Sequence, residues 1–272
     1  MPSRLPPGNA LVIPCDSVLT KAMSPAFLIR KAGSPIHTPA DWFRLAPPAS
    51  GEAAWQKGQA DREFADLFFN HEGTPAVPQV LGKTLTTHAG LGAVTLQSMI
   101  PAYLIALDPL PGGSHRCHAV AIGTCREGRV AVTQHARTEE GFGPLISDQL
   151  KRGKPGSQWA SRAARLAEAI LGRPLHSSGA LRGELLRLAA AALRVAEVEK
   201  AGTAVLLLHE FRAKTARPPQ VKRDATDLDA FASALGDKPL KDGFLTGPFR
   251  VPGGHEIPAS VPLYLGKITT LL

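Results

Sequence analysis

Two β-type runs separated by three residues constrain the fold of this chain more than any other feature. HAVAIGTC (118–125) and RVAVTQHAR (129–137) are rich in apolar and β-branched residues and flank Arg126, Glu127 and Gly128. Such runs around a short glycine-containing connection are typical of a tight β-hairpin. The sequence therefore predicts a hairpin over residues 118–137, around which the rest of the fold is organised.

The turn decides which residues of the hairpin face one another. If the last two residues of the connection form a two-residue turn, His118 lies opposite Arg137 and Val120 lies opposite His135. All four side chains then share one face, with two histidines and an arginine at the open end of the hairpin. This cluster predicts either an anion-binding site or a solvated strand end.

The flanking patterns predict further helices and strands. Thr38 can cap a helix that begins in HTPADWFRL, since Pro39 suits its first turn and Asp41 stands at the capping-box position. Further helices are expected at about 50–70, 157–171, 178–200 and 227–236, strands at 93–100, 102–108, 203–211 and 261–268, and a basic loop at 212–224. We expect one α/β domain over residues 1–272, with the helical segment at about 38–70 packed on the core.

The composition is that of a globular protein with one large core. The chain has 272 residues, of which 44% are hydrophobic and 20% charged, and no apolar run approaches the roughly 18 residues of a membrane span. Three cysteines without a Cys-x-x-Cys pair suggest a reducing compartment, and the N-terminus is too weakly apolar for a secretory signal. We expect a soluble, cytoplasmic protein that does not contact membranes.

A formal charge of +8 makes polyanions plausible partners. Neutralisation of phosphates by Lys and Arg supplies most non-specific affinity for nucleic acids. The charge therefore predicts either contact with DNA or RNA or a basic surface that is merely solvated.

Known catalytic motifs are largely missing from the sequence. GKT at 82–84 lacks the glycine that a phosphate loop needs five positions earlier, and the hydrolase, dinucleotide and zincin signatures do not occur. His115, Cys117, His118, Cys125 and His135 offer zinc-type ligands, but strand alternation places Cys117 and Cys125 on the face opposite His118. We expect ordinary strand residues here and no metal, with a divalent metal site as the alternative.

Several segments match one family in order along nearly the whole chain. They are PADWFRLAPP with AWQKGQADREFADLFF, PLPGGSHRCHAVAIG, VTQHARTEEGFGPLISDQL, LRGELLRLAAAAL with AVLLLHEF, and PLYLGKI. Together they resemble an uncharacterised group of bacterial proteins with a PD-(D/E)XK nuclease core. The resemblance implies an α/β fold of the restriction-endonuclease-like type, a mixed central sheet flanked by helices.

The same resemblance implies where the nuclease site stands. In such nucleases an Asp on one hairpin strand and a Glu-x-Lys on the next bind a divalent metal and orient the attacking water. These positions fall on His118, His135 and Arg137, and a polar position on the following helix falls on Glu184. Because two imidazoles lack the negative charge that holds magnesium, we expect that standard cleavage is lost.

These observations predict a catalytically degenerate nuclease-like protein that binds nucleic acid or serves as a non-catalytic subunit. A metal-dependent nuclease with a histidine-containing site and a protein-interaction module without nucleic acid remain the alternatives. The residues expected to contact phosphates are Lys151, Arg152, Lys154, Arg212, Lys214, Lys222 and Arg223.

Overall fold

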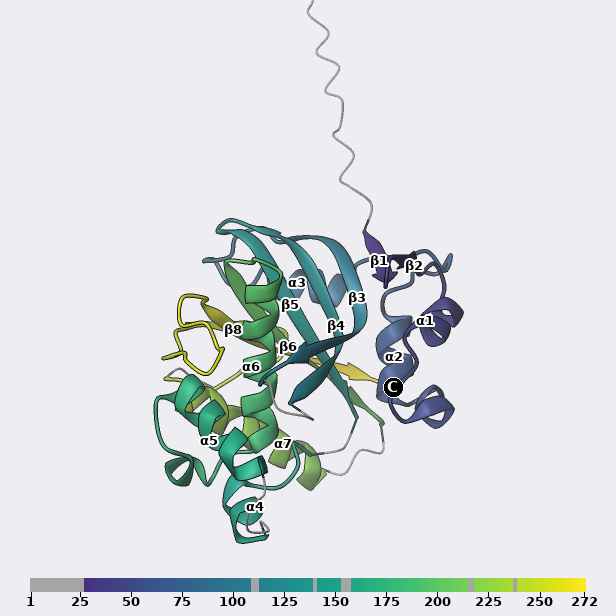
Figure 1. The fold of residues 1–272 in the computed structure, drawn as a ribbon. Helices are drawn as coiled ribbons and strands as arrows, with labels where there is room; N and C mark the ends of the chain where they lie inside the picture. The colour runs from purple at the N-terminus through teal and green to yellow at the C-terminus, as the bar shows by residue number, and fades with distance from the viewer. Residues whose placement is uncertain (1–26, 109–112, 139–140, 153–157, 215–217, 237–238) are drawn as a thin grey trace, which may run out of the picture.

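The structure, a computed structural model, describes residues 27–108, 113–138, 141–152, 158–214, 218–236 and 239–272. Eight strands in this part of the chain form one mixed sheet with the order β2-β1-β3-β4-β5-β6-β8-β7 (Figure 1). The strands are β1 (Leu28–Lys31), β2 (Ser34–Pro35), β3 (Thr95–Ala106), β4 (Ser114–Cys125), β5 (Gly128–Arg137), β6 (Thr203–Arg212), β7 (Leu245–Phe249) and β8 (Leu263–Leu271). The β3, β4 and β5 neighbours are antiparallel, whereas β5, β6 and β8 run parallel.

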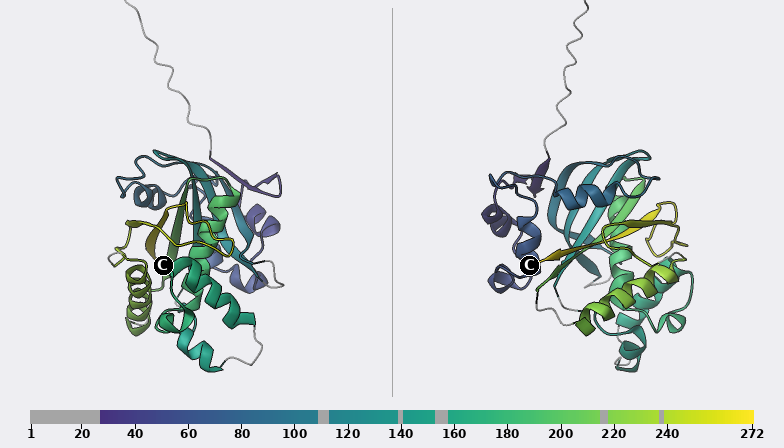
Figure 2. Two further views of the ribbon diagram at one scale, coloured as in Figure 1. Left: turned by 60° about the vertical axis from the view of Figure 1, so that its left-hand side comes forward. Right: turned by 180° about the vertical axis from the view of Figure 1, so that it is seen from behind.

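Helices cover both faces of the sheet, so the protein is a mixed α/β protein, as predicted (Figures 1 and 2). The helices of the described chain are α1 (Pro39–Leu45), α2 (Ala60–Asp66), α3 (Gln79–Leu85), α4 (Ile146–Arg152), α5 (Gln158–Leu171), α6 (Gly183–Val198) and α7 (Pro218–Ala234), with 3-10 turns at Gly51–Ala54 and Leu175–Ser178. Side chains of α5, α6 and α7 join one buried hydrophobic cluster with the sheet, and those of α1, α2 and α3 join the other. None of the described helices is long and apolar enough to span a membrane.

The predicted hairpin is confirmed, but its predicted register is wrong. Cys125 pairs with Gly128 and Val120 pairs with Thr133, so the turn consists of Arg126 and Glu127. Neither turn residue has a positive φ, whereas Gly128 has a φ of +106°. The turn therefore lies one residue earlier than predicted, and every cross-strand pair shifts by two residues. His118 therefore does not lie opposite Arg137.

Helix α1 begins as its capping pattern predicts. The Thr38 hydroxyl accepts a hydrogen bond from the Asp41 backbone N–H at 3.1 Å, and Pro39 occupies the first turn. The predicted helix over 50–70 is instead divided into the 3-10 turn Gly51–Ala54 and α2. Gly58 lies between them with a φ of +86°, a conformation that does not continue a right-handed helix.

Three other boundaries differ from the predictions. The two strands expected at 93–100 and 102–108 are one strand, β3, because β1 pairs with β3 only as far as Met99 and Pro101 therefore interrupts no hydrogen bond on that side. Residues 218–224 of the basic loop expected at 212–224 belong instead to α7, which begins at Pro218, since proline fits the first helical turn. Helix α6 begins at Gly183, after Leu145 and Arg182 have formed a short bridge.

Strands β6 and β8 confirm their predictions and complete the centre of the sheet. Every residue of β6 from Thr203 to Phe211 is buried, as expected for a strand covered on both faces. One face of α6 packs against the sheet, and its side chains Leu185, Leu188, Ala192 and Val195 are all buried. These packed elements hold the open end of the β4–β5 hairpin in place.

Candidate functional site

Strands β4 and β5 part at the open end of the hairpin. Their last cross-strand pair joins Ala119 to Gln134. Beyond it, residues 114–117 of β4 pair with β3, while residues 135–137 of β5 pair with β6. The divergence opens a pocket of about 290 Å³ between the two strands and the helices on either side.

The pocket brings together the four positions that the resemblance assigns to a nuclease site. His118, His135, Arg137 and Glu184 all line it. The imidazole rings of His118 and His135 lie 6.0 Å apart, centroid to centroid. Glu184 reaches the pocket from the first turn of α6.

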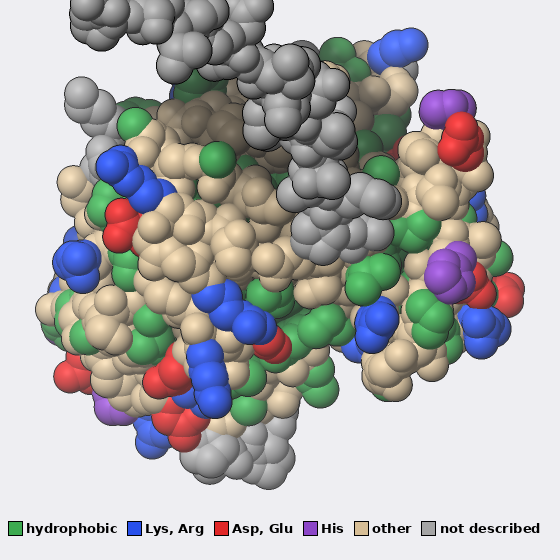
Figure 3. All heavy atoms as spheres, turned by 90° about the horizontal axis from the view of Figure 1, so that it is seen from above, with side chains coloured by type: hydrophobic (Ala, Val, Ile, Leu, Met, Phe, Trp, Pro, Cys, Tyr) green, Lys and Arg blue, Asp and Glu red, His purple; other side chains and the backbone are tan. Residues whose placement is uncertain are grey.

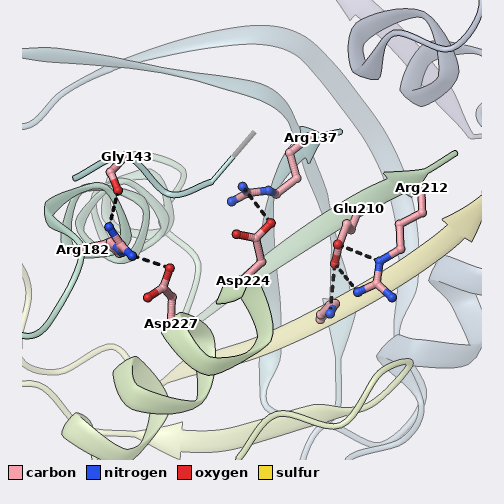
Figure 4. Close-up of polar contacts among 8 residues, drawn as sticks. Arg137, Gly143, Arg182, Glu210, Arg212, Asp224 and Asp227 are labelled. Carbon is pink, nitrogen blue, oxygen red and sulfur yellow. Dashed lines mark hydrogen bonds and ion pairs between the residues drawn. The ribbon is translucent and has the colours of Figure 1, made fainter. Parts of the chain in front are cut away.

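Arg137 is held firmly on the floor of the pocket. Its guanidinium carbon lies 3.6 Å from the centroid of the Phe142 ring, and a guanidinium nitrogen lies 3.5 Å from a carboxylate oxygen of Asp224 (Figure 4). Only 12% of the Arg137 side chain and 2% of the Asp224 side chain are exposed. Arg137 therefore sits in a fixed, charge-compensated position.

The two histidines are held neutral by their surroundings. Burial lowers the pKa of His118, although the nearby Asp61 carboxylate opposes the shift. Burial lowers the pKa of His135 well below its ordinary value, and the neighbouring imidazoles of His115, His118 and His209 add to the effect. Neutral imidazoles supply little of the charge that a magnesium ion or a phosphate needs.

Asp61 also lines the pocket, although it was not among the predicted site residues. It projects from α2 into the pocket, and its carboxylate oxygen lies 3.7 Å from Nε2 of His118. The signal was present in the sequence, because Asp61, Phe64 and Phe68 are spaced three and four residues apart and share one face of a helix. Phe64 and Phe68 are fully buried.

A second polar group below the pocket was hidden by the apolar run of β6. His209 Nε2 donates a hydrogen bond of 3.1 Å to Oε1 of Gln134, and both residues are buried. The next residue, Glu210, accepts hydrogen bonds from Arg212 (Figure 4). Its carboxylate also forms an ion pair with Lys267, with 3.0 Å between Oε2 and Nζ. Two polar residues in succession at the end of a buried strand were the available signal.

The residues expected to bind phosphates are divided among several places. Lys151 and Arg152 are exposed in the last turn of α4, and Lys222 and Arg223 are exposed on α7 rather than in a loop. Lys214 is exposed two residues after the end of β6, and Lys154 lies outside the described residues. Arg212 is committed to the Glu210 carboxylate through two hydrogen bonds of 2.7 and 3.0 Å.

Arg223 lies next to the candidate site. It lines a pocket of about 240 Å³ together with Arg182 and Asp227, and Gly141 borders both this pocket and the site pocket. Arg182 is fixed by hydrogen bonds to Asp227 at 2.9 Å and to the Gly143 carbonyl at 2.7 Å (Figure 4). Cationic side chains thus border one side of the site.

Both cysteines were predicted to lie on the face opposite His118, and this is wrong for Cys125. His118 lies on the α2 side of the sheet, against Phe64. Cys117 belongs to the buried cluster on the α6 side, whereas Cys125 packs against the cluster on the α2 side. Cys117 and Val120 both face α6 although they are three residues apart, so the alternation of β4 shifts by one residue between them. As a result, ligand atoms of His115, Cys117 and His135 lie within 4.8 Å of one another.

Comparisons with known proteins identify one family. The family model described as "Domain of unknown function (DUF6946)" matches residues 35–271. No curated protein and no solved structure matches the chain. The match covers every element from α1 to β8.

Proposed function

The chain belongs to the DUF6946 family, and we propose that it is a nuclease-like domain that has lost magnesium-dependent cleavage and binds nucleic acid. The observation that carries this proposal is the pocket where β4 and β5 part. Four positions expected from the resemblance to PD-(D/E)XK nucleases line it together, although they come from two strands and a helix. A mixed central sheet flanked by helices, with the hairpin in its middle, also agrees with that resemblance.

The donor groups in the pocket argue against a magnesium site of the usual kind. The two strand positions that would carry carboxylates carry His118 and His135, both neutral imidazoles. The pocket carboxylates, Asp61 and Glu184, come from helices: Asp61 lies beside the His118 imidazole, and Glu184 interacts electrostatically with Arg137. Because magnesium requires oxygen ligands in near-octahedral order, this set favours binding without cleavage.

Cationic residues on two helices support contact with a polyanion. Helices α4 and α7, which carry Lys151, Arg152, Lys222 and Arg223, lie at the same end of the molecule (Figures 1 and 2). The opposite end, uppermost in Figure 1, is seen in Figure 3, where the described Lys and Arg side chains are interspersed with Asp and Glu. We therefore assign phosphate contacts to the end that bears α4 and α7.

Salt-dependent binding tests the proposal. Fluorescence anisotropy with labelled DNA and RNA oligonucleotides should show an affinity that falls steeply between about 50 and about 200 mM salt. The double variant Lys151→Ala, Arg152→Ala should weaken binding to every sequence alike and reduce the slope of log K against log salt by about 2. Arg126→Ala, in the hairpin turn at the other end of the strands, is the matched control and should bind like the wild type.

Two outcomes would contradict the proposal. A salt-insensitive or absent interaction would favour a protein-interaction module. Cleavage of the oligonucleotides with Mg²⁺ or Mn²⁺, lost in His135→Ala, would instead establish a metal-dependent nuclease with a histidine-containing site.

A further inference from the structure

We propose that His115, Cys117 and His135 form a binding site for a transition-metal ion, Zn²⁺ in particular. One ligand atom from each side chain lies within 4.8 Å of the others. The site is displaced from the expected magnesium position toward α6, and it shares only His135 with that position. The proposal does not depend on nucleic-acid binding.

The backbone brings the three side chains to one side of the sheet. His115 and Cys117 are two residues apart on β4 and therefore project to the same face. His135 reaches that face from β5, just past the point where the two strands part. The rings of His115 and His135 lie 5.1 Å apart, centroid to centroid.

The distances between the three ligand atoms would suit a metal ion once the side chains move slightly closer together. Bonds of about 2.0–2.3 Å in tetrahedral geometry put neighbouring ligand atoms roughly 3.3–3.8 Å apart. Movements of about 1 Å or less would bring the three atoms into that range, which is within reach of side-chain rotation. Three protein ligands leave a fourth position for water or another ligand, as in catalytic zinc sites.

Buried nitrogen atoms without partners point to a ligand between these side chains. Nε2 of His115 and Nε2 of His135 are buried and make no hydrogen bond to the described residues. His135 as a whole is 6% exposed, and Cys117 is fully buried. Since an unsatisfied buried polar atom is costly, a metal ion coordinated by these nitrogens would remove the penalty.

The donor set is of the type that zinc prefers. Burial lowers the pKa of His115 to about 4, so its ring is neutral and able to coordinate a cation at physiological pH. Burial also raises the pKa of the Cys117 thiol to about 12 in the absence of metal. Coordination by Zn²⁺ would therefore release the Cys117 proton to solvent and form a Zn–thiolate bond.

The positively charged Arg187 side chain lies next to the site and has to move when a metal ion binds. A guanidinium nitrogen of Arg187 lies 3.4 Å from Nδ1 of His115. Coordination through Nε2 places the ring proton on Nδ1, which then cannot accept a hydrogen bond from Arg187. Arg187 is exposed on α6, so its long side chain can turn toward solvent.

Cobalt substitution tests the site directly. Zn²⁺ is d¹⁰ and gives no visible spectrum, whereas Co²⁺ in the same site gives an intense absorption band from thiolate-to-metal charge transfer. The full-length protein, freed of metal with a chelator and titrated with Co²⁺, should show this band with a sharp end point at one equivalent. Addition of Zn²⁺ should abolish the band by displacing Co²⁺.

Matched cysteine variants assign the band. Cys117→Ala should eliminate it, and Cys125→Ser, which changes the other described cysteine on the opposite face, should leave it unchanged. His115→Ala, at a partly exposed position where misfolding is least expected, should weaken Co²⁺ binding more than about tenfold. Circular dichroism of each metal-free variant should match that of the metal-free wild type.

The proposal is overturned if the wild type shows no thiolate band, or if the band survives in Cys117→Ala. A band that disappears in Cys125→Ser would likewise overturn it. None of these results bears on oligonucleotide affinity, so the failure of one proposal is distinguishable from the failure of the other.

Discussion

The histidines at the open end of the hairpin have a common property, which is that burial keeps them uncharged. Burial lowers the pKa of His209 to about 3, with a further contribution from His118. His209 is 1% exposed and lies against the Phe64 ring, with ring centroids 5.1 Å apart. An unfolded chain would instead bind a proton at this histidine near its ordinary pKa of 6.5.

This difference predicts that acid destabilises the fold before most carboxylates titrate. Because the folded-state pKa of His209 is depressed, its stability contribution is complete above about pH 6.5 and is lost as the pH falls toward 3. Between pH 6.5 and 5, the His209→Gln variant should lose less unfolding free energy than the wild type does. The difference should be up to about 1.4 kcal/mol per pH unit. Urea unfolding at a series of pH values measures the slope.

His71→Gln is the control for this experiment. The His71 side chain is 90% exposed, so its replacement should leave the pH slope unchanged. An equal slope in His209→Gln and the wild type would show that His209 is protonated to the same extent in the folded and unfolded chains.

At the residue scale, the resemblance placed His118, His135, Arg137 and Glu184 together, and they share a pocket. The hairpin spacing placed them wrongly, because the register differs and His118 faces the α2 side while Val120 faces the α6 side. Asp61 was not among the predicted site residues, because a charged side chain on a helix usually faces solvent. A charged side chain can lie on a buried face where the fold leaves a pocket, and only the packing of α2 on the sheet reveals that.

Among the elements, α7 is attached to the core by ion pairs as well as by apolar contacts. Its buried side chains with described positions are Asp224, Leu228, Phe231 and Ala232. Asp224 pairs with Arg137, and Asp227 pairs with Arg182 at 2.9 Å (Figure 4). The Arg182 and Asp227 side chains are only 16% and 10% exposed, so this pair is shielded from solvent.

Removing the charge of Asp227 should loosen α7 without unfolding the sheet. Asp227→Asn leaves Arg182 without its ionic partner, and we expect a loss of about 1–2 kcal/mol in the local opening free energy of the helix. Hydrogen exchange should show faster exchange of the amides at 221–234 and little change in β6. Lys222→Gln, on an exposed position of the same helix, should not change the exchange rates.

Equal exchange rates in Asp227→Asn and the wild type would mean that apolar contacts alone hold the helix. Faster exchange throughout the sheet would mean that α7 does not open separately from the core.

At this scale, apolar patterning predicted the long elements, and backbone conformation set the boundaries that the predictions missed. The hairpin, α5, α6, β6 and β8 have regular apolar spacing and were found where expected. Gly58 and Gly128 altered a helix and a register because both have positive φ, which the sequence does not disclose. The two prolines at the start of α7 were taken as loop residues although they also suit a first helical turn.

The whole molecule depends on strands that serve two hydrophobic clusters at once. Val205 and Leu207 of β6 face the cluster under α1–α3, while Leu206 and Leu208 face the cluster under α5–α7. Neither cluster can lose its strands without exposing the other. The order of the strands, which creates this arrangement, joins residues far apart in the chain and was not predicted from local patterns.

Shared strands predict that both faces of the sheet unfold in one transition. Trp42 is buried in the α1–α3 cluster, and Trp159 packs against the α5–α7 cluster, so each tryptophan reports on one face. Two variants each retain one tryptophan, Trp42 or Trp159, with the other tryptophans replaced by Phe. Within each variant, fluorescence and circular dichroism should give the same urea midpoint.

A substitution that creates a cavity on one face of the sheet tests whether the two faces unfold together. Phe64 is fully buried on the Trp42 side, so Phe64→Ala should reduce the free energy of unfolding by about 3–5 kcal/mol. In the protein that retains only Trp159, the same substitution should lower the Trp159 midpoint and the circular dichroism midpoint together, because the distant reporter shares β4, β5 and β6 with the altered face. A Trp159 midpoint that Phe64→Ala leaves unmoved would show that the α5–α7 face unfolds independently, and the strands would then not couple the two clusters.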